Sequence, residues 1–440
     1  MTEEFDPELA RKLKEEKKSA TRRKFLMGLA GTSVISAATV YGINSSGGST
    51  RSLGSLVGSG NSDLGAPGTT LGGQASAISQ AGAAAVSDRI LVLIELQGGN
   101  DGPSTVVPYG DSAYYDLRPN LAIPQAEVIP IDDQIGLSPE LATLSERRFA
   151  VVEGVGNTLD SLSHFDQQKL WHFGGGDGRV GFISQLGTEL GETYGTDRLV
   201  TLSVAGYAPQ LVGAGEGTLT LAGANQLRTL TRNDWVYPGY RQAVQRFSGG
   251  PLTTRLAQSY SQIGSLVQDL PEEIEIDRES RMIADGGQLG SQLWIAAGMI
   301  EAGTGARVIH AKIGGFDTHE GHVNRHAALM AQVDAAVDGF LDRMDNAGLS
   351  DRVLVALTSE FGRRGAENGA GLDHGNGSTL MVFGPVNEGR HGVYSSLSNL
   401  DDRGNLKTEI PYTSYLRTLA HDWLGTETIL PDAESITGLV

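Results

Sequence analysis

Residues 89–102 read RILVLIELQGGNDG, an almost continuous apolar run that ends in glycines, an asparagine and an aspartate. Such a run is typical of a strand that is buried on both faces of a parallel sheet and is followed by a tight turn. The same order recurs along the chain, because further apolar runs each end at or close to a glycine. These runs cover residues 149–153, 306–313, 352–358 and 380–383.

Helical patterns lie between the predicted strands. Residues 293–302 precede the third strand, and residues 323–347 carry apolar side chains three or four positions apart before the fourth. Strands that alternate with helices predict a mostly parallel sheet covered on both faces. We therefore expect one three-layer α/β/α domain, with a hairpin near residues 199–221 in its least regular part.

The N-terminal segment resembles an export signal. Residues 21–27 read TRRKFLM, and a moderately apolar run softened by glycine and serine continues to Ile43. This pattern resembles a twin-arginine (Tat) signal peptide, which implies the Tat export machinery as a partner and the periplasm or the cell exterior as the destination. The alternative is an uncleaved N-terminal membrane anchor, because a run of this length just spans a bilayer.

A low-complexity stretch separates this signal from the first predicted strand. Residues 44–88 are rich in glycine, serine and alanine, and they cannot bury enough apolar surface to offset the loss of chain entropy. We therefore predict a flexible linker. The expected organisation is a signal peptide over residues 1–43, a linker over residues 44–88 and the α/β domain over residues 89–440.

The composition of the 440 residues excludes several classes of protein. The formal net charge of −18 argues against a nucleic-acid partner, whose phosphates the chain would repel. The absence of cysteine excludes disulfides, thiol catalysis and thiolate metal sites. The sequence carries no signal for an oligomeric state.

Acidic and histidine side chains gather just after the predicted strands. Asp101 follows the first strand, Asp317 and His319 follow the third, and Glu360 follows the fourth, with His374 soon after it. The carboxyl ends of parallel strands share one edge of a sheet, so these side chains are expected to converge. Carboxylate oxygens and imidazole nitrogens suit one or two divalent cations such as zinc, manganese or calcium. Taken singly, each residue fits a turn or a helix cap equally well.

Two further residues are candidates for catalysis. Ser163 precedes a predicted helix over residues 166–173, and its hydroxyl suits either a metal-activated nucleophile or a helix cap. Arg363, beside Arg364, suits either a bidentate clamp for an anionic substrate or a surface pair. Three neighbouring residues are candidates for supporting roles: Asn100, His164 and Asp373.

A histidine pair lies at the start of the helix predicted over residues 323–347, with one member just before that range. His322 and His326 are four positions apart and therefore share one helix face. The pair fits either a metal site or a partly exposed helix face.

Taken together, these motifs resemble the bacterial family called domain of unknown function 1501, whose members are typically exported by the Tat route. The resemblance covers residues 89 to about 425. The motifs that carry it are ELQGGNDG at 95–102, VPY at 107–109, SHF at 163–165, GFDTH at 315–319, SEFGR at 359–363, DHG at 373–375 and DWLG at 422–425.

That family is similar in fold to the alkaline phosphatase and sulfatase superfamily, whose members hydrolyse phosphate or sulfate esters with metal ions at strand ends. The resemblance implies a metal-dependent hydrolase of a small anionic ester, phosphate more than sulfate, with Ser163 near the nucleophile's place. It matches five residues to metal ligands: Asp101, Asp317, His319, Glu360 and His374. The chain departs from the superfamily at Glu360-Phe361, where an Asp-His pair is usual, and it lacks the sulfatase signature around Ser163. The alternative is a non-catalytic exported binding or assembly protein that retains the fold.

Overall fold

The computed structural model describes residues 88–440 apart from residues 158, 160, 177, 196–197, 214–216, 224–225 and 227–273. The predicted signal peptide and all but the last residue of the predicted linker lie outside the described residues and stay predictions. Among the helices of the described part, none is long and apolar enough to cross a membrane.

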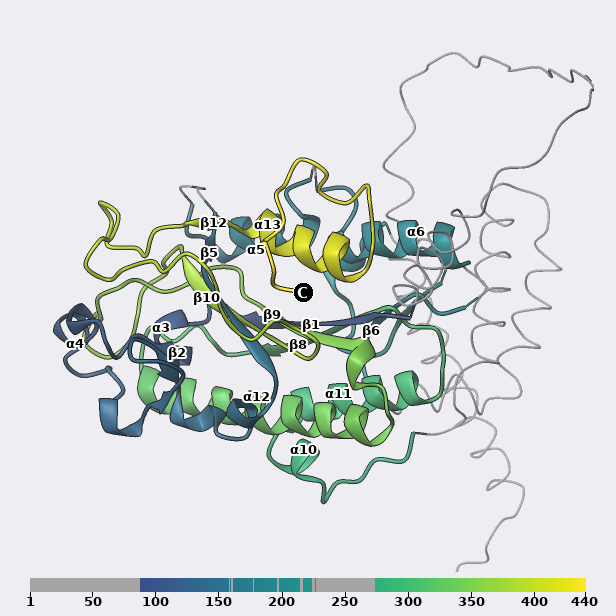
Figure 1. Cartoon of the computed structure of the whole chain (residues 1–440), viewed down its shortest axis with the longest axis horizontal. Coiled ribbons are helices and arrows are strands. Elements are labelled where there is room, and N and C mark those ends of the chain that lie inside the picture. The colour runs from purple at the N-terminus through teal and green to yellow at the C-terminus, as the bar shows by residue number, and fades with distance from the viewer. Residues whose placement is uncertain are drawn as a thin grey trace, which may run out of the picture. The chain divides into compact units, whose positions relative to one another are not determined.

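A sheet of nine strands forms the middle layer of the described domain (Figure 1). Its strands are β1 (Ile90–Gln97), β5 (Phe149–Gly156), β6 (Thr201–Ser203), β7 (Thr218–Thr220), β8 (Val308–Gly314), β9 (Val353–Thr358), β10 (Ser378–Phe383), β11 (Gly389–Gly392) and β12 (Ile410–Pro411). The spatial order is β11-β5-β10-β9-β1-β8-β6-β7, and β12 also pairs with β5. A second, small sheet has the order β2-β4-β3, formed by Val106–Val107, Gly136–Leu137 and Ile129–Pro130 respectively.

Most neighbouring strands of the large sheet run parallel, as predicted. β1 pairs in parallel with β8 and β9, and β5 pairs in parallel with β11. The exception is β10, which runs antiparallel to both β5 and β9, whereas its apolar run had indicated another parallel strand. As a result β1, β5, β8 and β9 all end at one edge of the sheet, and β10 begins at that edge.

The structure differs from the predicted hairpin near residues 199–221. β6 and β7 pair in parallel, with Thr201 beside Thr218. Parallel neighbours cannot be joined by a tight turn. The connecting chain instead includes the short 3-10 helix η5 (Pro209–Leu211).

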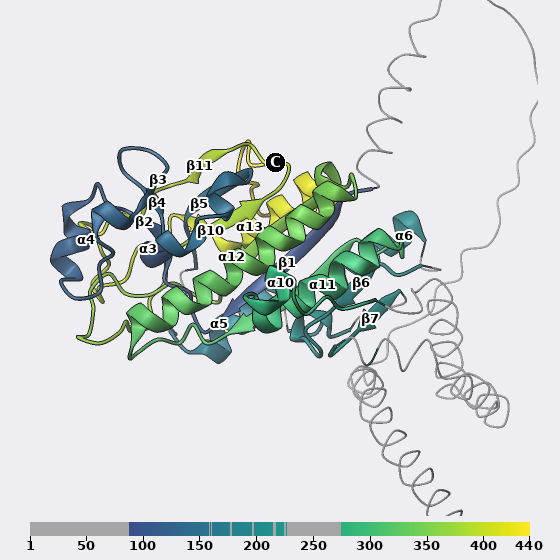
Figure 2. The ribbon, with the colours of Figure 1, turned by 90° about the horizontal axis from the view of Figure 1, so that it is seen from below.

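Helices cover both faces of the sheet (Figures 1 and 2). One face carries α10 (Arg281–Ala284), α11 (Gly287–Glu301) and α12 (His322–Asn346), and the other carries α5 (His164–Phe173), α6 (Phe182–Tyr194) and α13 (Tyr412–Arg417). The predicted three-layer α/β/α class is therefore confirmed. The remaining helical elements are α3 (Gly102–Thr105), α4 (Ser112–Leu117), η2 (Gln125–Glu127), η3 (Pro139–Leu141), η4 (Leu144–Glu146), η6 (Ser350–Arg352) and η7 (Thr418–Trp423).

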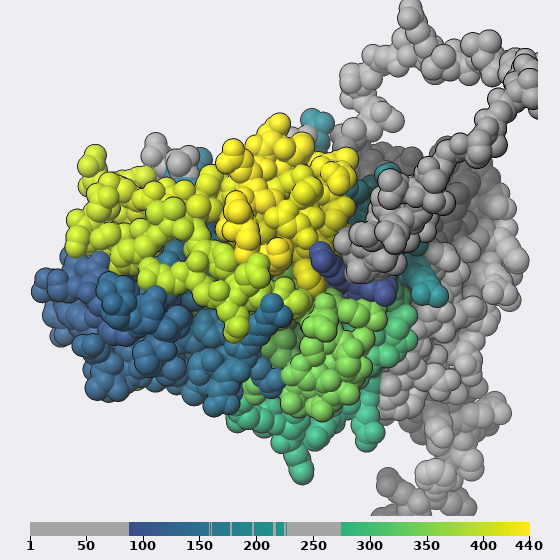
Figure 3. Space-filling model, viewed as in Figure 1, coloured from purple at the N-terminus to yellow at the C-terminus, as the bar shows by residue number. Residues whose placement is uncertain are grey.

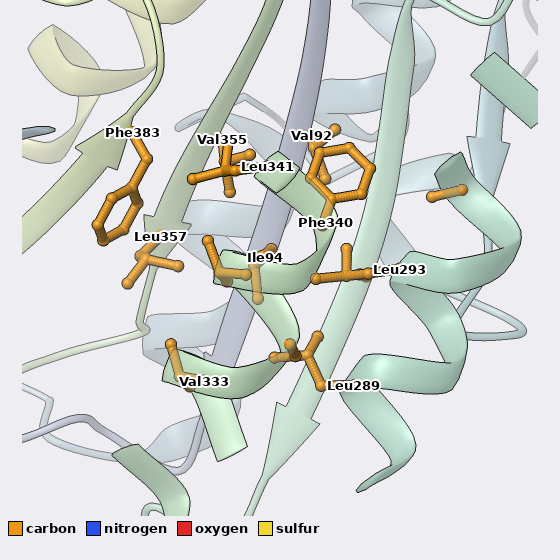
Figure 4. Close-up of a cluster of buried hydrophobic side chains, with 14 of the residues drawn as sticks. Val92, Ile94, Leu289, Leu293, Val333, Phe340, Leu341, Val355, Leu357 and Phe383 are labelled. Atoms are coloured by element: carbon orange, nitrogen blue, oxygen red, sulfur yellow. The ribbon is translucent and has the colours of Figure 1, made fainter. Parts of the chain in front are cut away.

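The side chains of β1 alternate between two apolar clusters, which explains why both faces are covered. Val92 and Ile94 pack toward α11 and α12, in the cluster that contains Leu293 and Phe340 (Figure 4). Leu93 points to the opposite face and joins the cluster of α5, α6 and α13. Burying each such side chain contributes about 1.5–3 kcal/mol. The C-terminal residues belong to this second cluster, and Figure 3 shows them in yellow on the upper surface beside the preceding yellow-green segment.

Candidate metal centre

The edge where the parallel strands end gathers chemically active side chains from several loops. His164 opens α5 after β5, Asp317 and His319 follow β8, Glu360 follows β9, and His374 precedes β10. Because β10 runs antiparallel, its beginning lies beside the ends of the other strands. The unexpected direction of this strand is therefore what brings His374 to the site.

His164, Asp317 and His374 form a candidate metal site, since one ligand atom of each lies within 4.8 Å of the others. His374 Nε2 lies 3.3 Å from Asp317 Oδ1, and His164 Nε2 lies 3.5 Å from Asp317 Oδ2. His319 adjoins this group, with its Nε2 atom 3.2 Å from Asp317 Oδ1 and 2.9 Å from His374 Nε2. Ligand atoms at zinc-like bond lengths in a tetrahedral site lie about 3.3 Å apart, so the spacing suits a small cation.

Each of the three imidazoles makes a hydrogen bond through its Nδ1 atom, on the side of the ring away from Asp317. The contacts are His164 Nδ1 to Glu360 Oε1 at 2.9 Å, His319 Nδ1 to Asp373 Oδ1 at 3.2 Å and His374 Nδ1 to the carbonyl of Leu162 at 2.7 Å. A carbonyl or an ionised carboxylate can only accept, so each Nδ1 carries the hydrogen and each Nε2 presents a lone pair. Histidines that bind metals are usually oriented in this way.

None of the three Nε2 atoms has a hydrogen to donate. The Nε2 atoms of His319 and His374 face each other at 2.9 Å, and both face Asp317 Oδ1. His164 Nε2 is buried and has no hydrogen-bond partner among the described residues. Lone pairs this close repel one another unless a cation or an additional proton lies between them. Three imidazole nitrogens and one carboxylate are therefore a donor set that fits a divalent metal.

Arg363 has a different place from the one expected. Its guanidinium is fully buried, and Nη2 binds Asp317 Oδ1 at 2.8 Å. Burial alone would raise the pKa of Asp317, but the hydrogen bond and charge of Arg363 outweigh burial and lower it to about 2. The other contacts of the guanidinium are the carbonyl oxygens of Gly98, Gly99, Phe316 and Leu372. A buried guanidinium needs such partners, so Arg363 joins the loops of the site and does not clamp a substrate.

Asp101 also departs from the expected arrangement. Its two carboxylate oxygens bind Arg118 at 2.6 and 3.0 Å, and both side chains are fully buried. Burial would raise the pKa of Asp101, but Arg118 holds it well below its usual range. The planar guanidinium matches both carboxylate oxygens, so Arg118 supplies the positive charge that we had expected from a metal.

Glu360 lies behind His164. Its carboxylate accepts hydrogen bonds from the backbone N–H of Gly98 at 2.9 and 3.1 Å, from His164 Nδ1 and from Gln168 Nε2 at 3.1 Å. These donors occupy both oxygens. The structure thus places Glu360 as a support for the candidate ligand His164, whereas the sequence predicted Glu360 itself as a ligand.

The pair of His322 and His326 is buried, which contradicts the partly exposed helix face that was one alternative drawn from the sequence. His322 contacts the hydroxyls of Thr318 at 2.8 Å and Ser104 at 3.1 Å, while His326 Nε2 lies 3.0 Å from Asn100 Oδ1. Burial lowers the pKa of His322 to about 4 and that of His326 to about 3. Both rings are therefore neutral near pH 7 and tie α12 to the loops after β1 and β8.

Ser163 and Asp373 lie at the margin of the centre. Ser163 is the N-cap residue of α5, directly before His164, but its hydroxyl makes no capping bond. Asp373 binds Asn368 Nδ2 at 3.0 Å as well as His319, and these hydrogen bonds, that of Asn368 first, lower its pKa. The sequence placed His164 only among supporting residues and gave no sign of Arg118. Nothing in a local motif shows that an arginine 17 positions after Asp101 returns to it.

Comparisons with known proteins agree with the resemblance drawn from the motifs. A family model described as a protein of unknown function (DUF1501) matches residues 222–400, which confirms that resemblance over a stretch containing Asp317, His319, Glu360 and His374. Among curated proteins, none matches the sequence.

Similar solved structures are remote. The lipoteichoic acid synthase LtaP from Listeria monocytogenes is 10% identical with a TM-score of 0.37, covering 80% of this chain and 75% of that one. The PsFucS1 sulfatase from Pseudoalteromonas sp. is 11% identical with a TM-score of 0.37, covering 81% and 72%. The phosphonate monoester hydrolase SpPMH from Silicibacter pomeroyi is 9% identical with a TM-score of 0.38, covering 80% and 77%. Scores this low transfer none of these activities to the chain.

Proposed function

We propose that this chain, whose residues 222–400 match the DUF1501 family model, is an exported metal-dependent hydrolase of small anionic esters, phosphate more than sulfate. One observation supports the proposal above all. The buried Nε2 atom of His164 has no hydrogen-bond partner among the described residues, and it faces a carboxylate that two further imidazole lone pairs also face.

The metal would be held by His164, Asp317, His319 and His374. Three nitrogens and one oxygen favour zinc over calcium, which prefers an all-oxygen set. A bound divalent cation would supply Lewis-acid stabilisation for the negative charge that develops on the ester oxygens. One metal ion is favoured over two, because Arg118 neutralises the carboxylate of Asp101.

Ser163 is the candidate nucleophile. It stands directly before the ligand His164 at the start of α5, and its hydroxyl is not used in capping. The first N–H groups of a helix have no partner within the helix and favour an anion. A phosphate monoester carries more negative charge than a sulfate monoester, so a cation together with a helix N-terminus favours the phosphate.

The proposal is tested by metal analysis of the purified chain and by assay of phosphate and sulfate monoesters and diesters. We expect about one zinc per chain and phosphomonoester hydrolysis that Ser163→Ala and His374→Ala each abolish. The proposal would be contradicted if His374→Ala retained as much zinc as wild type, or if the chain were active without any metal.

The second candidate is a non-catalytic binding or assembly protein. It is favoured by the burial of Arg363, whose donors are directed at protein oxygens and are not available to clamp a substrate. Tightly held zinc without turnover of any ester would support this second candidate.

A further inference from the structure

Three polar side chains lie on one face of α5. His164, Gln168 and His172 are four positions apart, so they project from successive turns on the same side. His164 and Gln168 both contact Glu360 Oε1, at 2.9 and 3.1 Å. His172 Nε2 contacts Glu95 Oε1 at 3.0 Å, on the far end of the helix from the metal centre.

Glu95 is the charged residue within the central strand β1, where every other position except the terminal Gln97 is apolar. It is buried and accepts hydrogen bonds from His172 Nε2 and, at 2.9 Å, from Gln210 Nε2, while His310 Nε2 lies 3.5 Å away. Burial would raise the pKa of Glu95, but His172 and His310 hold it well below its usual range. A buried carboxylate is costly to form and more costly to leave without a donor, so this contact resists displacement.

The apolar packing of α5 rests mainly on Trp171, whose ring lies against Tyr412 and Tyr415. The buried residues of α5 are Gln167, Trp171 and His172, and Trp171 is the single apolar one among them. Even Trp171 makes a polar contact, since its Nε1 donates to the backbone carbonyl of Glu360 at 3.0 Å. Hydrogen bonds depend on direction far more than apolar contacts do. The polar contacts therefore add a directional constraint on where the helix lies along its own axis.

A small cavity lies between the two ends of this polar face. Glu95, His172 and Gln210 line it together with Gln168 and Glu360. The Oε1 atom of Gln210 is buried without a hydrogen-bond partner among the described residues. The far anchor of α5 and the support of His164 therefore belong to one continuous polar layer beneath the metal centre.

We propose that the buried contact between His172 and Glu95 is a positioning device for the metal ligand His164. His172 lies eight positions after His164, about 12 Å along the helix, so a shift at one end is transmitted to the other. The contact fixes the position of α5 along its axis, and at this position His164 Nε2 lies 3.5 Å from Asp317 Oδ2. This inference rests on the proposed metal centre, but neither His172 nor Glu95 touches a metal ligand in it.

The test compares zinc affinity and the visible spectrum of the cobalt-substituted full chain. His172→Phe keeps a ring of similar size but cannot donate to Glu95, and we expect it to weaken zinc binding about tenfold, as loss of an outer support does. It should also alter the cobalt d–d bands, which report the ligand geometry and not the overall stability. His172→Gln retains a donor and should restore most of the affinity. His391→Phe, on the peripheral strand β11, is the matched control and should bind as wild type does.

The outcomes separate this inference from the proposed function. Wild-type chain that binds no zinc overturns the metal centre and this inference with it. Wild-type chain that binds zinc, with unchanged affinity and spectrum in folded His172→Phe, overturns this inference alone. If His172→Phe does not fold, His172→Asn, whose donor is too short to reach Glu95, replaces it with the same expected and contrary results.

Discussion

Replacement of Arg363 by methionine should destabilise the chain strongly. The side chain of methionine fills much of the same space but donates no hydrogen bond. Arg363 is fully buried, and its guanidinium satisfies four backbone carbonyls besides Asp317. Leaving the four buried carbonyls without this donor costs about 1 kcal/mol each. The ion pair adds little, because the side chain of Asp317 is 46% exposed. We therefore expect the free energy of unfolding to fall by about 3–5 kcal/mol.

The assay is urea denaturation, followed by fluorescence, of the metal-free chain. The neighbouring substitution Arg364→Met is the control, because the side chain of Arg364 is partly exposed and its nearest carboxylate, that of Asp373, is 4.0 Å away. An exposed substitution of this kind changes stability by about 0.5 kcal/mol or less. A midpoint for Arg363→Met no lower than that for Arg364→Met, at equal denaturant slope, would refute the structural role assigned to Arg363.

Other predictions concern the neighbouring ion pair, acid stability and export. Arg118→Met should also lower the free energy of unfolding by about 3–5 kcal/mol, yet leave zinc stoichiometry unchanged; loss of zinc would restore Asp101 as a ligand. The pKa of His326 falls from 6.5 unfolded to about 3 folded, so its stabilising effect is complete above pH 6.5 and is lost as the pH falls toward 3. His326→Gln should therefore flatten the decline in melting temperature between those values, and an unchanged decline would count against the buried neutral ring. Lysines in place of Arg22 and Arg23 should retain the protein in the cytoplasm, and normal export, measured by cell fractionation, would refute the Tat assignment.

The strands of the fold could be predicted because their signal is local. The run around Leu93 predicted β1 to within a residue at each end, since only a strand buried on both faces requires so many consecutive apolar side chains. The signal that determines the direction of a strand is not local. The run at residues 380–383 has the same composition whether β10 lies parallel or antiparallel, and only its partners β5 and β9 decide the direction. The pairing of β6 with β7 escaped prediction for the same reason.

The candidate site could be predicted in its location but not in its assignment of roles. Asp317, His319 and His374 lie together, as strand ends in a parallel sheet suggested. Whether a carboxylate faces the centre or supports a histidine depends on partners far away in sequence. The carboxylate of Glu360 accepts a hydrogen bond from the N–H of Gly98, 262 positions earlier, and no motif around Glu360 predicts that contact.

The metal centre is tested most directly by a crystal structure of the zinc-soaked chain, with anomalous difference maps recorded on both sides of the zinc absorption edge. The account predicts one strong peak, bounded by Nε2 of His164 and of His374 and by the carboxylate of Asp317, with His319 completing the set. A peak beside Asp101 with Arg118 displaced, or no peak at all from a chain that diffracts well, would contradict it.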